Sequence, residues 1–208
     1  MSDSRNFAPS LIDRLRQRMP SVRVTQGLVA ANVLVFVAML MAGAGLWHSP
    51  NGVQLAWGAS FGPATKDGQW WRLASAMFLH FGVLHLAMNM WALWDAGSFV
   101  ERMYGRAHFI VIYFISGLVG NLLSLIVQGD RAVSGGASGA VFGVFGALLV
   151  FLWRERGELH PREFRWLFWG AAGFAAMTIV LGLLVTGIDN AAHIGGFCAG
   201  GLAGMFLA

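Results

Sequence analysis

The chain has 208 residues, of which 57% are hydrophobic and only 12% are charged, about half the charged fraction of ordinary soluble domains. Its nine tryptophans, sixteen phenylalanines and twenty-eight glycines indicate an integral membrane protein rather than a soluble one. The net charge of +4 comes from basic residues spaced between apolar runs, which argues against a nucleic-acid partner, and the single Cys198 excludes an internal disulfide or a multi-cysteine metal site.

Residues 1–26 contain five arginines, and the stretch "LIDRLRQRM" is weakly amphipathic. This pattern predicts a short interfacial tail on the cytoplasmic side, followed by one membrane domain over 27–208. "AGA" at 42–44 resembles a signal-peptide cleavage site. The apolar region from residue 27 is longer than the roughly 7–15 residues of a signal peptide, which favours a retained span.

Apolar runs predict six membrane-spanning helices, since a hydrocarbon core of about 30 Å takes roughly 20 residues of helix. Residues 47–79 are too polar to span and too aromatic for a free linker, so we expect an ordered loop lying partly in the interface. The fold class is therefore an all-α membrane bundle of six helices with a long interfacial first loop. The expected spans are 27–46, 80–100, 107–127, 137–153, 166–186 and 190–208.

Lysine and arginine are distributed unevenly between the loops. With the N-terminus in the cytoplasm, eleven of them lie on the inner side and three on the outer side. This positive-inside bias predicts that spans two, four and six enter from the outer face and run parallel to one another.

Four polar side chains occur near the start of these same three spans: His85, Asn89, Ser138 and His193. Polar groups inside spans are costly and are candidates for function. The fifteen residues from Ser138 to Trp153 cover about 22 Å of helix, which places Ser138 several ångströms below the outer surface. A hydroxyl, two imidazoles and a carboxamide at one depth supply a nucleophile, a base and oxyanion donors.

Each residue alone also has an ordinary structural interpretation. Ser138 suits a helix N-cap, or a small contact beside the GxxxG spacing of Gly139 and Gly143. His193 suits a single buried hydrogen bond, and His85 with Asn89, four residues apart, suits a polar clamp between helices. Other chemistries lack their motifs, since the sequence contains no HExxH, no GxGD-like run, no GxSxG and no phosphate-binding glycine loop.

The motifs "GASG" (136–139), "AHIGG" (192–196) and "HLAMN" (85–89) resemble the GxSG, AHxxG and HxxxN motifs of the rhomboid family of intramembrane serine proteases. "WR" at 71–72 and Glu101–Arg102 followed by Gly105 also match, and the resemblance covers roughly residues 70–205. Many relatives carry a tyrosine four residues after the serine, where this chain has Phe142. His80, which recurs in some relatives, is expected to be peripheral.

The resemblance implies Ser138 as nucleophile and His193 as general base, with the oxyanion bound by His85, Asn89 and the backbone N–H of Ser138. It also implies supporting roles for a second group: Gly136, Gly139, Gly196, Phe142, Arg72 and Glu101. The implied function is cleavage of transmembrane protein substrates near the outer face of a bilayer, without metal, nucleotide or other cofactor.

Two other functions stay open from the sequence. One is a catalytically inactive rhomboid-like protein that binds membrane helices; such proteins usually lack the serine or the histidine, and this chain has both. The other is a small transporter or channel, for which Asp95 is the single acidic candidate at mid-span and no internal repeat is evident. The arginine-rich, lysine-poor composition suggests a bacterial inner membrane.

Overall fold

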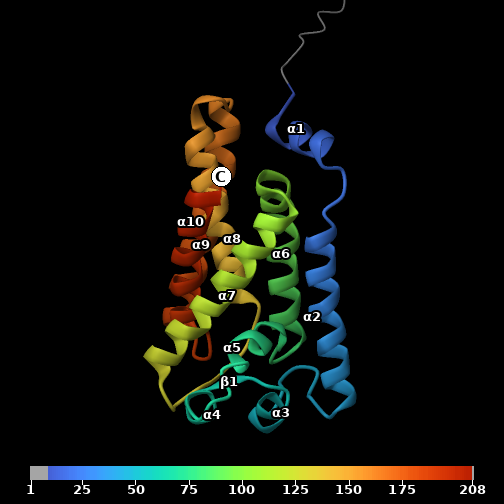
Figure 1. The fold of residues 1–208 in the computed structure, drawn as a ribbon, viewed down its shortest axis with the longest axis vertical. Coiled ribbons are helices and arrows are strands. Elements are labelled where there is room, and N and C mark those ends of the chain that lie inside the picture. The colour runs from blue at the N-terminus through green and yellow to red at the C-terminus, as the bar shows by residue number, and fades with distance from the viewer. Residues whose placement is uncertain (1–8, 208) are drawn as a thin grey trace, which may run out of the picture.

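The computed structural model describes residues 9–207, so residues 1–8 of the tail lie outside the described part of the chain. Six long helices form an elongated bundle (Figure 1). They are α2 (Arg23–Met41), α6 (Val83–Tyr104), α7 (Arg106–Gln128), α8 (Ser138–Arg154), α9 (Pro161–Leu184) and α10 (Asn190–Leu207). These coincide with the six apolar runs of the sequence, although α2 begins four residues earlier and ends five residues earlier than expected, and α9 begins five residues earlier.

Four helices are long and apolar enough to cross a membrane within residues 9–207: α2, α7, α8 with the 3₁₀ turn η2 (Glu155–Gly157), and α9. A fifth span results if α6 is joined to the preceding segment 72–78, from which it is bent by 93°. Helix α10 falls short because its 18 residues include five glycines, an asparagine and a histidine, which lower its hydropathy. The fold is an all-α membrane bundle, and the count of six spans stays a prediction.

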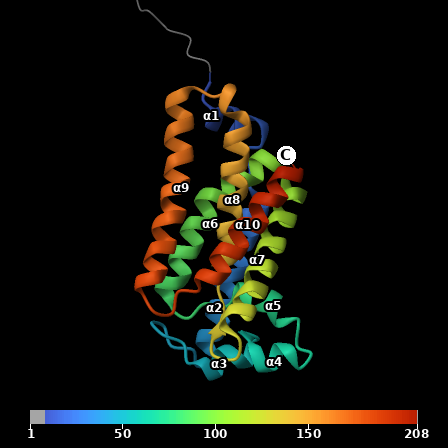
Figure 2. The ribbon, with the colours of Figure 1, turned by 90° about the vertical axis from the view of Figure 1, so that its left-hand side faces the viewer.

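The long first loop is ordered, as the sequence predicts. It contains α3 (Asn51–Ala56), β1 (Ser60–Phe61), α4 (Gly62–Lys66), α5 (Arg72–Ser75) and the 3₁₀ turn η1 (Ala76–Phe78). Strand β1 pairs antiparallel with β2 (Val133–Ser134), which places the loop beside the chain leading into α8. The loop lies across one end of the bundle, at the end where α6, α8 and α10 all begin (Figures 1 and 2).

Arg72 holds this loop together. Its Nη1 donates to the carbonyl oxygens of Leu55 at 2.8 Å and Ala59 at 3.1 Å, and its Nε donates to Gln69. Its guanidinium also lies 4.9 Å from the centre of the Trp71 ring. One cation therefore satisfies three acceptors in a segment that has little regular secondary structure of its own.

Glu101 fastens α6 to α2 near the opposite end of the bundle. The fully buried carboxylate accepts hydrogen bonds from the backbone N–H groups of Val24 and Thr25 at 3.0 and 2.7 Å, and from the Thr25 hydroxyl at 2.7 Å. These N–H groups belong to the first turn of α2 and have no acceptor within that helix. Gly105, with φ +82°, then ends α6 and leaves a single residue before α7.

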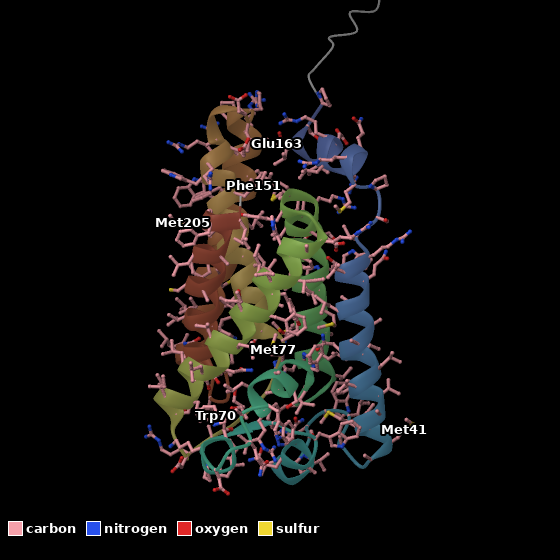
Figure 3. All side chains as sticks on the ribbon, viewed as in Figure 1. Met41, Trp70, Met77, Phe151, Glu163 and Met205 are labelled. Carbon is pink, nitrogen blue, oxygen red and sulfur yellow. The ribbon has the colours of Figure 1, made fainter. Side chains whose placement is uncertain are left out.

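The amphipathic tail stretch folds as α1 (Leu11–Arg18). Leu11 and Leu15 are buried against the bundle, and the Leu11 N–H donates to Glu163 at 2.8 Å. Figure 3 shows Glu163 at the end of the bundle where α1 lies. Helix α1, the α6–α7 turn and the α8–α9 loop therefore share one end, and the arginines of these described segments gather there.

Helices α8 and α10 approach closely enough for backbone contact. A Cβ atom at Gly196 would overlap the carbonyl of Gly139, and one at Gly200 would overlap the backbone of Gly143. Small residues on both faces permit this approach, which is the usual way membrane helices pack tightly. On the outside of the bundle, by contrast, large apolar side chains such as Met41 and Met205 are exposed (Figure 3), as expected for surfaces that face lipid.

We predict that Gly200→Ala destabilises the protein and that Gly201→Ala does not. The new methyl group at position 200 would overlap the Gly143 backbone, whereas at position 201 the nearest atoms lie 3.9 Å away, an ordinary contact. Thermal or denaturant unfolding in detergent should show a loss of about 1–3 kcal/mol for Gly200→Ala. Equal stability of the two variants would contradict the close α8–α10 contact.

Candidate active site

Ser138 is the first residue of α8, and the segment before it is held from several sides. The Gly136 N–H donates to the Ala76 carbonyl at 2.8 Å, and β2 pairs with β1 two residues earlier in the chain. Ser138 is partly exposed, while the residues on either side of it are buried. The first N–H groups of α8 have no acceptor within the helix, so this end offers free donors beside the hydroxyl.

Gly136 brings His85 to the serine. Its φ is +146°, which residues with a side chain rarely adopt. A Cβ there would lie 2.9 Å from His85 Cε1, 3.0 Å from His85 Nε2 and 3.7 Å from Ser138 Oγ. The missing side chain therefore leaves a space that the imidazole edge and the serine hydroxyl share.

The hydrogen bonds of His85 indicate which ring nitrogen carries the proton. Its Nδ1 accepts from the Phe81 N–H at 3.5 Å, which assigns the proton to Nε2. Nε2 is the nitrogen nearest to Gly136. Asn89 lies one turn further along α6, is almost fully buried, and uses one amide N–H to donate to the His85 carbonyl at 2.9 Å.

His193 lies in the first turn of α10 and is 5% exposed. Its ring stacks on Phe142, with centroids 4.2 Å apart and planes inclined by 3°. Its Nδ1 has no hydrogen-bond partner among the described residues. The imidazole is therefore oriented by ring packing on α8 and by the course of α10, and none of the carboxylates in residues 9–207 is bonded to it.

Ser138 and His193 lie on adjacent helix ends. Phe142, one turn after the serine, stacks on the histidine, and a Cβ at Gly139 would lie 3.3 Å from the carbonyl oxygen of Ala192. The hydrogen bonds between residues 9 and 207 include none that joins the two side chains directly. Catalytic hydrogen bonds are often longer in a protein without substrate, so this geometry is compatible with a dyad.

Arg72 and Glu101 lie apart from these four residues and stabilise the first loop and the α2–α6 contact described above. His80, expected at the periphery, is instead fully buried and packs edge-on against His85 with ring centroids 5.0 Å apart. The sequence places Asp189 at a loop edge without a GxGD-like run and assigns it no role, whereas in the structure it bonds to Ser124 and Ser134. Its place four residues before His193, at the start of an apolar helix, was the available signal.

The described helices bring a serine at a helix start, two histidines and a carboxamide to one end of a membrane bundle, which are the groups of an acyl-transfer site. A sequence model of the rhomboid domain matches residues 67–208. The chain belongs to the rhomboid family, whose named members include rhomboid proteases.

Several relatives are similar over most of this chain. Rhomboid protease GluP of Bacillus subtilis is 35% identical over 83% of the chain and 32% of its own length. Putative rhomboid protease YdcA of the same organism is 34% identical over 64% of the chain and 65% of its own length. Rhomboid protease AarA of Providencia stuartii is 30% identical over 93% of the chain and 75% of its own length. The chain thus spans less than two thirds of the first two relatives.

We predict that Gly136→Ala strongly reduces the reactivity of Ser138 towards a fluorophosphonate, because the methyl group would meet His85 and the backbone would be strained. Displacing one oxyanion donor costs about 10²-fold or more. Gly135→Ala is the matched control, since its new Cβ would lie at ordinary contact distances of 3.4–3.5 Å. Equal labelling rates of the two variants would show that the Gly136 contact with His85 is unimportant.

Proposed function

We propose that the chain is an intramembrane serine endopeptidase that cleaves transmembrane protein substrates in or near their membrane segment through Ser138 and His193. The observation that carries the proposal is the convergence of Ser138, His85 and His193 at one end of the bundle, from three parallel helices. Family membership supports the protease class.

In this mechanism His193 accepts the proton of the Ser138 hydroxyl while Oγ attacks the scissile carbonyl carbon. The resulting oxyanion accepts hydrogen bonds from His85 Nε2–H, from the second Asn89 amide N–H and from the Ser138 backbone N–H. The protonated His193 then donates its proton to the leaving amine, and water hydrolyses the acyl-enzyme with the same base. No metal or other cofactor takes part.

In this chain Phe142 stands at the position, four residues after the serine, where many relatives have a tyrosine. Its ring lies flat against His193, so the imidazole has a fixed plane without a phenolic hydroxyl beside it. Phe142 therefore holds the His193 imidazole by packing alone. Aromatic stacking of this kind contributes about 0.5–1.5 kcal/mol beyond the burial of apolar area.

We also propose that the chain is one membrane domain, 27–208, with a cytoplasmic tail, 1–26, and that the active site opens to the outer face of a bacterial inner membrane. The arginines at the α1 end of the bundle support this orientation. Arg102 donates to the Met19 carbonyl and Arg106 to the Ser21 carbonyl at this end. The other end of the described chain carries Lys66, Arg72 and Arg131, far fewer basic residues than the α1 end.

Ser138→Ala should abolish cleavage of a transmembrane substrate by the purified protein in liposomes, because the nucleophile is lost. Ser98→Ala, on the distant part of α6, is the control and should cleave like the wild type. A fluorophosphonate should label the wild type and Ser98→Ala but not Ser138→Ala. Equal cleavage by wild type and Ser138→Ala would refute the assignment, and a folded wild type that neither cleaves nor is labelled would favour the inactive helix-binding protein.

The orientation predicts opposite accessibility of two exposed loop positions. In a Cys198→Ala background, a membrane-impermeant maleimide should label Asp67→Cys in intact right-side-out vesicles and Glu158→Cys only after permeabilisation. Both replaced residues are acidic, and acidic residues contribute little to orientation. The reverse labelling pattern would contradict the proposed topology.

A further inference from the structure

The carboxylate of Asp189 joins three separate segments of the chain. Its Oδ2 accepts hydrogen bonds from the hydroxyls of Ser124 and of Ser134, the latter at 2.6 Å, and its Oδ1 accepts from the Ala192 N–H at 3.0 Å. Asp189 is partly buried and Ser124 is almost fully buried. Hydrogen bonds to an ionised carboxylate at these distances are the strong kind.

Each of the three donors lies close to the site. Ser134 is in β2, four residues before Ser138, and Ala192 directly precedes His193. Ser124 is on α7, where α7 packs against α10: a Cβ at Gly120, one turn earlier, would lie 2.6 Å from the Ala192 carbonyl. The Asp189 side chain thus connects β2, which leads to Ser138, with the start of α10, which carries His193, and with α7, which packs against α10.

This connection matters because the His193 ring is positioned by stacking on Phe142 and by the course of α10. His193 Nδ1 has no partner among residues 9–207, so the position of the ring follows from the position of α10 and from the Phe142 stack. Helix α10 is entered from α9, only 11% of whose most apolar window is buried. The Asn190 amide, which donates to the Ile179 carbonyl at 3.0 Å, joins the start of α10 to α9, and Asp189 joins it to α7 and β2.

We propose that Asp189 is a positioning residue, which holds the segment from Ser134 to Ser138 in register with the start of α10 so that Ser138 and His193 face each other. The proposal rests on the proposed dyad and adds a residue that does not touch the substrate. A misplacement of about 1 Å between reacting groups can cost 10²-fold in rate. The effect should therefore fall on kcat, with KM nearly unchanged.

A double-mutant cycle of Asp189→Ala and Ser134→Ala tests this role, with kcat, KM and the rate of fluorophosphonate labelling as readouts. Asp189→Ala should lower kcat and labelling about 10- to 100-fold. Ser134→Ala should lower them about threefold to tenfold in the wild-type background, as expected for one lost hydrogen bond, and should have no further effect when residue 189 is alanine. Ser124→Ala should behave like Ser134→Ala.

Two controls separate positioning from simpler effects. Asp130→Asn removes another carboxylate of the same region, bonded to Lys66 on the exposed surface, and should leave kcat within about twofold of the wild type. The serine variants leave the bond from Asp189 to the Ala192 N–H intact, so a loss of kcat in them cannot come from helix capping. They also keep the test available if Asp189→Ala does not fold.

The possible results are distinct. The positioning role would be overturned if the effects of Asp189→Ala and Ser134→Ala were additive, or if the serine variants had unchanged kcat. In either case, labelling of the wild type would still support the dyad. A rise in KM with constant kcat would assign Asp189 to substrate binding and would also overturn it. A folded wild type that is neither labelled nor active would refute the proposed function and this inference together.

Discussion

Backbone contact between α8 and α10 is the constraint on which the candidate site depends. The two helices carry Ser138 and His193 in their first turns, and a serine hydroxyl and an imidazole can meet only if the axes lie unusually close. Gly139, Gly143, Gly196 and Gly200 remove the side chains that would keep the backbones apart. The same glycines reduce the hydropathy of α10, so that close packing and ready insertion into lipid oppose each other in this helix.

The remaining parts of the site are held by polar contacts that end on backbone atoms. Arg72 ties the first loop to itself, the Ala76 carbonyl holds Gly136, and Asp189 holds the start of α10. Loop segments lack the repeating hydrogen bonds of a helix, so these charged and carbonyl groups supply the partners that the irregular backbone needs. The end that carries the candidate site is thus held by these hydrogen bonds, and the opposite end by those of the buried Glu101.

Much of the fold follows from the sequence, because lipid imposes a simple rule. Apolar runs of about 20 residues mark helices, and the six runs match the six long helices of the structure to within a few residues at most ends. The motifs around Ser138, His193, His85 and Asn89 identify the chemistry only as a group, since each residue alone has an ordinary structural explanation. Membership of the rhomboid family, expected from these motifs, is confirmed by the comparisons.

Other features depend on the rotation of helices and the course of loops, which spacing along the chain does not reveal. The burial of His80 against His85 results from the 93° bend before α6, and the bonds of Asp189 to Ser124 and Ser134 join residues 65 and 55 positions apart. The stack of Phe142 on His193 follows from the face that α8 turns towards α10. Sequence periodicity could indicate that these residues lie in helices or loops, but it could not predict which of them contact one another.

The unequal burial of the helices has a consequence for how this sequence can diverge. In α8, with η2, 61% of the most apolar window is buried, and in α9 only 11%. Side chains along α9 mostly face lipid, so hydrophobicity matters there more than shape. One aliphatic residue can therefore replace another in α9 with little effect. Along α8 most positions have a neighbour to fit, so we expect its sequence to change more slowly than that of the helix which follows it.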